Sequence, residues 1–158
     1  MTIRAPLVII NGRIQELPIG DSIAGGSGDS GGGIEAQAAT TGEDVVVSEL
    51  LYLTGSGIAN RAQADAIGTS YIVGVCTLGA TSGNTCEFLT EGVVSISDWT
   101  ECIGSVSLSP GTLYFLDPSN PGQMVTTAPT TVTQTVVIVG RAVSAQVLDL
   151  TITQPILL

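Results

Sequence analysis

The pattern of hydrophobic and polar positions changes twice along the chain. Residues 5–20 are rich in aliphatic side chains, and residues 23–43 are mostly Gly, Ser, Ala and Thr with almost nothing to bury. From residue 44 onward, short β-branched runs alternate with turn signals. This pattern predicts three parts: an N-terminal arm (residues 1–22), a Gly-rich tether (23–43) and a β-structured body (44–158).

The arm has the pattern of a β-hairpin. Leu7–Ile10 is a short apolar run, and Asn11-Gly12 is a dipeptide favoured in two-residue hairpin turns. Residues 13–17 return as the partner strand before Pro18 ends the pairing. Because two short strands are only marginally stable alone in water, we expect the hairpin to bind another subunit.

The body has the pattern of an all-β domain. Strands are predicted at residues 44–53, 70–77, 86–97, 105–108, 112–116, 134–144 and 147–153, the third with a break at Glu91-Gly92. Residues 58–66, rich in alanine, fit either a short helix or an irregular excursion, and residues 117–122 fit a tight loop. Strands at this spacing indicate a small β-barrel or sandwich.

Two predicted strands share a glycine inside an aliphatic run. Gly74 interrupts the run at residues 71–76, and Gly140 interrupts the run at residues 136–142. Glycine inside a strand is typical of a bend or a β-bulge. We expect both strands to bend at these positions.

Composition and charge favour an assembly protein. Hydrophobic residues make up 44% of the chain and charged residues only 11%, so we expect other subunits to cover part of the surface. The net charge is −10, and the four basic residues, Arg4, Arg13, Arg61 and Arg141, are scattered. Phosphate contact needs clustered cations, so neither nucleic acid nor a membrane surface is predicted as a partner.

The cysteines and acids do not form a recognisable metal site. Cys76, Cys86 and Cys102 are interpreted as small buried residues in a reducing compartment, with a Cys76–Cys86 pair left open. Three thiols without a His leave tetrahedral zinc coordination incomplete. Asp117 and Asn120 lack the alternating oxygen ligands of a calcium loop, so no cofactor is predicted.

Targeting signals are equally weak. The apolar run Leu7–Ile10 is too short for the apolar region of a signal peptide and too short to span a bilayer. We therefore expect neither secretion nor membrane insertion.

One stretch resembles a catalytic motif. Gly28-Asp29-Ser30-Gly31-Gly32 matches the sequence around the nucleophile of trypsin-like proteases. The chain contains no His and no Lys that could take the proton of Ser30. The absence of Lys also argues against a phosphate-binding P-loop. We interpret this stretch as part of the tether.

Carboxylate pairs are the remaining catalytic candidates. Glu87 and Glu91 flank one predicted strand, and Asp98 and Glu101 flank Trp99. Acids near strand ends are usually solvated, so we predict no enzymatic activity. An enzyme, for instance a small glycan hydrolase built on carboxylates, is the third hypothesis, and loss of turnover in Glu87→Gln would support it.

A few apolar residues of the body are candidates for subunit contacts. Trp99 is the chain's one tryptophan, a residue type that anchors either cores or interfaces. The tail ends in three apolar residues, Ile156, Leu157 and Leu158. We predict a subunit interface at these four positions.

Two stretches resemble structural proteins of tailed-bacteriophage virions. Residues 4–18, RAPLVIINGRIQELP, resemble N-terminal segments of virion proteins, including fibres. The second stretch comprises LSPGTLYFLD at 108–117, Pro-Gly at 121–122, VGRAVS at 139–144 and PILL at 155–158. It is similar to β-domains of phage decoration proteins and fibres, which are commonly trimeric. The resemblance implies a structural role and carries no catalytic residues.

The preferred hypothesis is a homotrimeric capsid decoration (cement) protein on the virion head. Its arms would bind the major capsid protein or another virion protein, through these seven aliphatic residues: Leu7, Val8, Ile9, Ile10, Ile14, Leu17 and Ile19. Three arms on one trimer would make later binding events intramolecular. The alternative is a short tail fibre or host-adhesion subunit that uses the same arm as its anchor.

Overall fold

The computed structural model describes residues 35–158 together with the backbone of residues 7–10 and 13–16. The chain divides into two compact units, Met1–Gly33 and Ile34–Leu158. In the first unit, β1 (Leu7–Ile10) pairs antiparallel with β2 (Arg13–Glu16). Leu7 lies opposite Glu16 and Ile10 lies opposite Arg13, so the predicted hairpin pairing is confirmed. The protease-like stretch at residues 28–32 lies outside the described residues.

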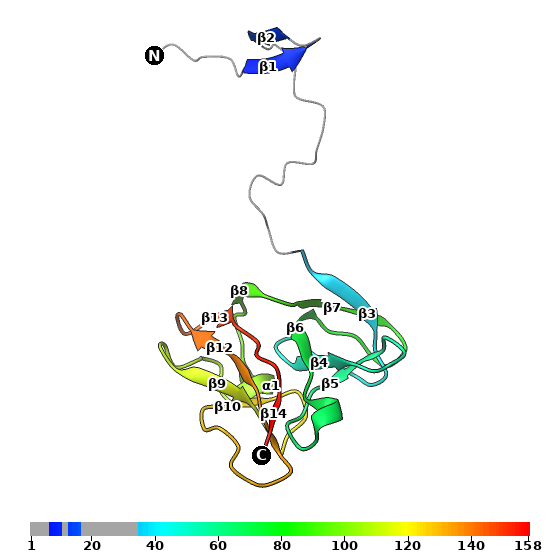
Figure 1. Ribbon diagram of the computed structural model, residues 1–158, viewed down its shortest axis with the longest axis vertical. Helices are drawn as coiled ribbons and strands as arrows, with labels where there is room; N and C mark the ends of the chain where they lie inside the picture. The colour runs from blue at the N-terminus through cyan, green and yellow to red at the C-terminus, as the bar shows by residue number, and fades with distance from the viewer. Residues whose placement is uncertain (1–6, 11–12, 17–34) are drawn as a thin grey trace. The chain divides into compact units, whose positions relative to one another are not determined.

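The second unit, Ile34–Leu158, begins earlier than the predicted body and is called the body from here on. It is all-β as predicted and contains two five-stranded antiparallel sheets (Figure 1). The N-terminal sheet has the order β3-β7-β6-β4-β5. Its strands are β3 (Gln37–Thr40), β4 (Leu50–Leu53), β5 (Ala59–Arg61), β6 (Ile72–Leu78) and β7 (Thr85–Leu89). The described strands therefore form separate sheets and not one closed barrel.

The C-terminal sheet has the order β10-β9-β12-β13-β8. Its strands are β8 (Gly92–Ser95), β9 (Leu113–Leu116), β10 (Met124–Val125), β12 (Ile138–Ala142) and β13 (Val147–Leu150). A separate two-stranded ribbon joins β11 (Thr135–Val136) to β14 (Ile156–Leu157). Two short helical turns, η1 (Ile67–Thr69) and α1 (Thr100–Ile103), complete the described elements.

The two sheets share one hydrophobic core. Leu50 and Val75 of the N-terminal sheet pack in one cluster with Val94, Leu116 and Leu148 of the C-terminal sheet, and all five are almost completely buried. Burying such aliphatic side chains contributes about 1.5–3 kcal/mol each. Because this cluster draws on both sheets, the described residues of the body form a core of their own.

Trp99 belongs to this core. It is 0% exposed, and its Nε1–H donates a hydrogen bond to the Gln146 carbonyl oxygen at 3.3 Å. Complete burial within its own chain leaves Trp99 no surface to offer another subunit. The predicted interface role of Trp99 is therefore wrong, and the residue anchors the core instead.

The N-terminal sheet is buried on its second face as well. Leu51, Cys76, Cys86 and Phe88 form a separate buried cluster with Val45. Because successive strand residues point to opposite faces, Leu50 and Leu51 enter different clusters. The three cysteines are buried, as the sequence predicted, and all three are free.

Both predicted strand bends coincide with irregular pairing. The register of β6 against β4 shifts next to Gly74, and the register of β12 against β9 shifts next to Gly140. A Cβ atom at Gly74 would overlap the Leu89 carbonyl oxygen, and one at Gly140 would overlap the Asp149 carbonyl oxygen. Close approach of the neighbouring strand explains why both positions are glycine.

Three predicted boundaries differ from the structure. Residues 37–40, assigned to the tether, form β3 at the edge of the N-terminal sheet. An edge strand of small residues pairs through its backbone and needs no large side chain to bury. In the predicted strand 44–53, only Leu50–Leu53 is a strand, because the backbone turns at Ser48 with a φ of 82°. Residues 58–66 contain a strand, β5, and no helix.

The predicted strand at 105–108 is also absent from the described structure. The chain bends at its two serines: the Ser105 hydroxyl donates to the Ser107 carbonyl oxygen and accepts from the Ser107 N–H, each at 3.4 Å. Such local side-chain bonds compete with strand pairing. The break at Glu91-Gly92 is confirmed, since β7 ends at Leu89 and β8 begins at Gly92 in the other sheet.

Candidate functional site

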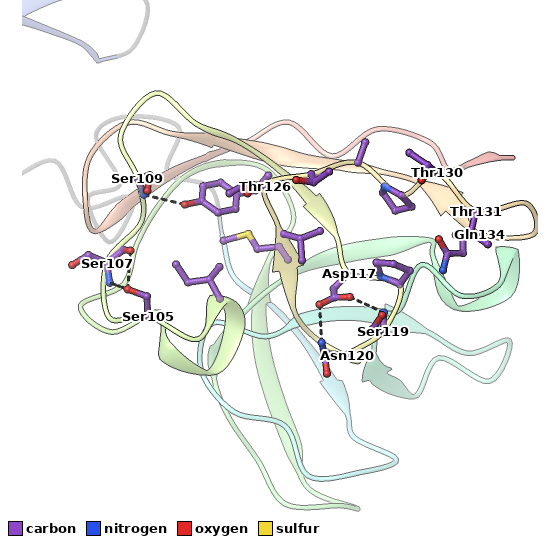
Figure 2. A pocket seen from close by; sticks show the side chains of 18 residues that line it. Ser105, Ser107, Ser109, Asp117, Ser119, Asn120, Thr126, Thr130, Thr131 and Gln134 are labelled. Atoms are coloured by element: carbon purple, nitrogen blue, oxygen red, sulfur yellow. Dashed lines mark hydrogen bonds between the residues drawn. The ribbon is translucent and has the colours of Figure 1, made fainter.

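The first candidate site, the hydroxyl groove, is an open groove of about 820 Å3 on the body (Figure 2). Most of its lining residues carry hydroxyl or amide groups. They come from three loops, at residues 105–109, 117–120 and 126–131, together with Gln134. The apolar residues of the lining include Ile103 and Met124. The lining therefore offers many hydrogen-bond donors and acceptors.

Asp117 is engaged within its own loop (Figure 2). The Ser119 N–H donates to Asp117 Oδ1 at 2.6 Å, and Asn120 Nδ2 donates to Asp117 Oδ2 at 2.9 Å. These bonds satisfy both carboxylate oxygens and hold the tight loop that the sequence predicted at residues 117–122. Among the described residues, no group of three or more His, Cys, Asp or Glu side chains could hold a metal ion.

The hydroxyls of this groove have no catalytic base beside them among its lining residues. Tyr114 is buried, and its Oη accepts a hydrogen bond from the Ser109 N–H at 2.9 Å. Asp117 is the only carboxylate in the lining. Asp117 is committed to its loop, so the one carboxylate of this lining is already hydrogen-bonded on both oxygens.

The second candidate site, the valine groove, is an open groove of about 840 Å3 with a mainly apolar lining. Its residues are Asp44, Val45, Val46, Val47, Gly79, Ala80, Thr81, Ile96, Ser97, Asp98, Thr100 and Glu101. Val46 and Val47 are 43% and 40% exposed. The three acids of the lining are all exposed to solvent. The site thus combines an apolar surface with negative charge.

Backbone bonds fix the shape of the valine groove. Val45 and Ala80 exchange two N–H···O=C hydrogen bonds, each of 2.9 Å. On the other side, the Thr100 N–H donates to Asp98 Oδ1 at 2.9 Å at the start of α1. Hydrogen bonding from Thr100 lowers the pKa of Asp98, so this acid carries its charge at neutral pH.

Arg61, Glu43 and Glu49 form a network of charges. Both glutamates lie within two residues of the segment 44–47 that lines the valine groove. Arg61 Nη2 bonds Glu43 Oε2 at 2.8 Å, and Arg61 Nη1 lies 3.7 Å from Glu49 Oε1. The Val46 N–H donates to Glu49 Oε2 at 2.9 Å. Burial raises the pKa of Glu49 above its ordinary value of 4.5 despite this bond and the charge of Arg61. For Glu43, burial is outweighed by the Arg61 contacts, and the pKa is lowered.

The cysteines have the character of core residues. Burial, with a further contribution from neighbouring Cys86, raises the pKa of Cys76 to about 12. Burial also raises the pKa values of Cys86 and Cys102. Buried thiols of this kind are not reactive nucleophiles. The sequence left a Cys76–Cys86 disulfide undecided, and in the structure both thiols are free.

The structure separates most of the residues that the sequence offered as sites. Glu87 lies on β7 and Glu91 lies in the link to β8, both exposed, whereas Asp98 and Glu101 come together in the valine groove. Ile156, Leu157 and Leu158 are 63%, 58% and 42% exposed at the end of the chain. Of the arm residues, the described strands include the backbone of Leu7–Ile10 and Ile14. Leu17 and Ile19 lie outside the described residues.

Neither groove was identified from the sequence, although each leaves a signal there. The hydroxyl groove is lined by two Ser- and Thr-rich segments. The valine groove is lined by three consecutive valines, whose pattern predicts a strand.

A scan against protein-family models gives no match, and a search of curated proteins also gives none. Within the described ranges, no helix has the length and apolar character needed to cross a membrane.

Proposed function

We propose that this chain is a non-enzymatic structural protein of a tailed-bacteriophage virion, and specifically a trimeric capsid decoration (cement) protein. One observation carries the proposal: the chain divides into two compact units, and the apolar hairpin belongs to the first, Met1–Gly33. This division agrees with the arm expected from the sequence resemblance.

Within residues 35–158, the body has a hydrophobic core to which both of its sheets contribute. Its buried hydrophobic residues run from Val45 to Leu150, and the two sheets supply them together. The hairpin pairs only four residues on each strand. Such a short hairpin gains stability by binding a host surface, through apolar burial and added strand pairing. The arm would tie each copy to its neighbours in the particle.

The exposed tail supports a contact between bodies. Ile156 and Leu157 pair with Val136 and Thr135 in the two-stranded ribbon, yet both remain more than half exposed. Apolar exposure on a chain with few charges favours a subunit interface. A trimer that holds three arms would attach to a repetitive lattice more firmly than any single arm.

The test is attachment to the phage head. Deleting residues 1–20 should leave a folded body that no longer binds heads stripped of this protein, as measured by co-sedimentation. A matched variant with Val143→Asp, an exposed position of the body, should bind like wild type. Undiminished binding by the deletion variant would refute the arm's role.

A short tail fibre or host-adhesion subunit is the second candidate, and the hydroxyl groove favours it. Serine and threonine hydroxyls with amide groups suit a polar ligand such as a glycan. Labelling of intact particles separates the two candidates. Signal over the head supports decoration, whereas signal at the tail tip supports adhesion.

A further inference from the structure

We infer that the outer face of the C-terminal sheet binds the same face of a second copy of this chain. The outer face is the one that points away from the core shared by the two sheets. The inference rests on the proposed trimer and deepens it by naming the surface through which the bodies meet. Its support comes from the apolar side chains of this face, from two opposite charges on it, and from the acidity of the rest of the body.

Strand alternation divides the side chains of the C-terminal sheet between two faces. Those that point into the shared core are Val94, Tyr114, Leu116, Leu148 and Leu150. Because successive strand residues point to opposite faces, their neighbours along β8, β9 and β13 point away from the core. Residues opposite one another in neighbouring strands share a face, which adds positions on β10 and β12. The outer face therefore carries six apolar side chains: Val93, Leu113, Phe115, Val125, Ile138 and Val147.

These six side chains form an apolar surface that the described body leaves partly exposed. Val93 is 60% exposed, and the other five are half-buried. None of the six belongs to either hydrophobic cluster of the described residues. The N-terminal sheet differs, since its second face carries the buried cluster that includes Val45. A continuous apolar surface on a sheet is typical of a contact with another subunit.

The outer face continues into the exposed tail. Residues 135–139 alternate between buried and half-buried, so Val136 points to the same side as Ile138. Val136 lies opposite Ile156, which is 63% exposed. The tail that supports a contact between bodies therefore extends the same surface.

Two opposite charges lie next to each other on the outer face. Arg141 of β12, the central strand, is directly opposite Asp149 of β13. Arg141 Nη1 donates to the Gly111 carbonyl oxygen at 2.6 Å. Within residues 35–158, both ion pairs involve Arg61, so Arg141 and Asp149 have no ion-pair partner there. Each charge is available to a residue of another chain.

Charge favours a second copy as the occupant. Residues 35–158 contain eleven acids and two arginines, whereas the outer face carries one acid and one arginine. The rest of the described body thus has a large excess of acids, and contact between two copies there is opposed by like-charge repulsion. Two copies that meet through the outer face place Arg141 of each beside Asp149 of the other.

Symmetry then supplies the whole matching surface. The same face on a second copy brings apolar side chains against apolar side chains, with both charges paired. Repeated around a threefold axis, the contact pairs each Arg141 with the Asp149 of the next copy. One kind of chain is sufficient for this assembly.

Charge variants of the full-length chain test the inference by sedimentation equilibrium. Arg141→Asp leaves two acids at the centre of the face, and Asp149→Arg leaves two arginines. Each variant alone should associate about tenfold more weakly than wild type. A mixture of the two should associate more tightly than either alone, because their faces then carry opposite charges. If the two residues acted only within one chain, mixing would give no gain.

An apolar variant with a matched control gives the second test. Val93→Glu places a charge on the outer face and should weaken association about tenfold. Val106→Glu is the control, because Val106 is similarly exposed, at 55%, in a loop outside the sheet. It should associate like wild type. Near-UV circular dichroism of every variant checks that the body remains folded.

The outcomes separate this inference from the proposed function. Wild type that stays monomeric overturns the inference, as does association that Val93→Glu and both charge variants leave unchanged, or a mixture that associates no better than its components. If wild type is monomeric and deletion of residues 1–20 still abolishes head binding, the inference fails and the arm's proposed role stands. If wild type associates through this face but binds no heads, the interface stands and the decoration role fails.

Discussion

At the scale of single residues, two non-glycine positions within residues 35–158 adopt a left-handed backbone. Ser48 and Thr133 both have a φ of 82°. Ser48 is fully buried, whereas Thr133 is exposed and its N–H donates to the Leu158 carbonyl oxygen. The strain at Ser48 is combined with a buried hydroxyl that has no hydrogen-bond partner in the described part of the chain, so this residue lowers the stability of the body.

Replacement of Ser48 should therefore stabilise the protein. Ser48→Gly removes both the strain and the unpaired hydroxyl and should raise the free energy of unfolding by about 1 kcal/mol. Ser48→Ala removes only the hydroxyl and should gain less. Urea unfolding of both variants measures the difference. Destabilisation by Ser48→Gly would show that the hydroxyl has a partner.

The two glutamates around Arg61 should respond to pH in opposite directions. The lowered pKa of Glu43 contributes stability above pH 4.5 that is lost as the pH falls through the folded-state pKa. The raised pKa of Glu49 makes its ionisation costly to the folded state as the pH rises above 4.5. These shifts have opposite signs, although both side chains contact the same arginine.

Thermal unfolding of two matched variants between pH 3.5 and 7.5 tests this difference. Relative to wild type, Glu43→Gln should lose stability as the pH rises. Over the same interval, Glu49→Gln should gain stability relative to wild type, and its amide oxygen can still accept the Val46 N–H. Parallel pH profiles for the two variants would contradict the assignment.

At the scale of elements, the glycines at the two irregular strand pairings are the most constrained positions. Gly74→Ala and Gly140→Ala should each destabilise the body by about 3 kcal/mol, because the new methyl group meets a carbonyl oxygen of the adjacent strand. Gly55→Ala, with no atom within 4 Å of the added Cβ, is the control and should be nearly neutral. Chemical denaturation measures all three. Tolerance of alanine at both strand positions would exclude close strand approach.

Elements with a strong local pattern were predictable from the sequence. The sequence patterns of residues 112–116 and 147–153 predicted strands that correspond to β9 and β13. The predicted break at Glu91-Gly92 marks the point where the chain passes from one sheet to the other. The hairpin pairing followed from Asn11-Gly12. By contrast, β3 is a strand because its backbone pairs with β7. Its own small residues do not have a sequence pattern that predicts a strand.

The candidate sites were less predictable, because each depends on segments far apart in sequence. The valine groove joins residues 44–47 to residues 79–81 and 96–101. Its three valines have high strand propensity, but the turn at Ser48 overrides it. Trp99 was ambiguous from the sequence alone, since a lone tryptophan fits a core or an interface equally, and only its packing decided the question.

At the scale of the whole molecule, the division into two units predicts that the stability of the body does not depend on the first unit. Removing residues 1–33 should leave the unfolding temperature of the body within about 2 °C of wild type, because the body's own residues form its core. Calorimetry at low micromolar concentration measures this and limits association between copies. A fall of more than about 5 °C would mean that the arm contributes to the fold of the body.

The position of β3 also has a consequence for how the protein is made. Thr40 of β3 pairs with Thr85 of β7, so Thr40 is synthesised 45 residues before its partner. At roughly 5–20 residues per second, β3 and the arm ahead of it wait several seconds during translation without a completed sheet. The arm is thus synthesised before the body, and a neighbouring polypeptide can meet it before the sheets of the body are complete.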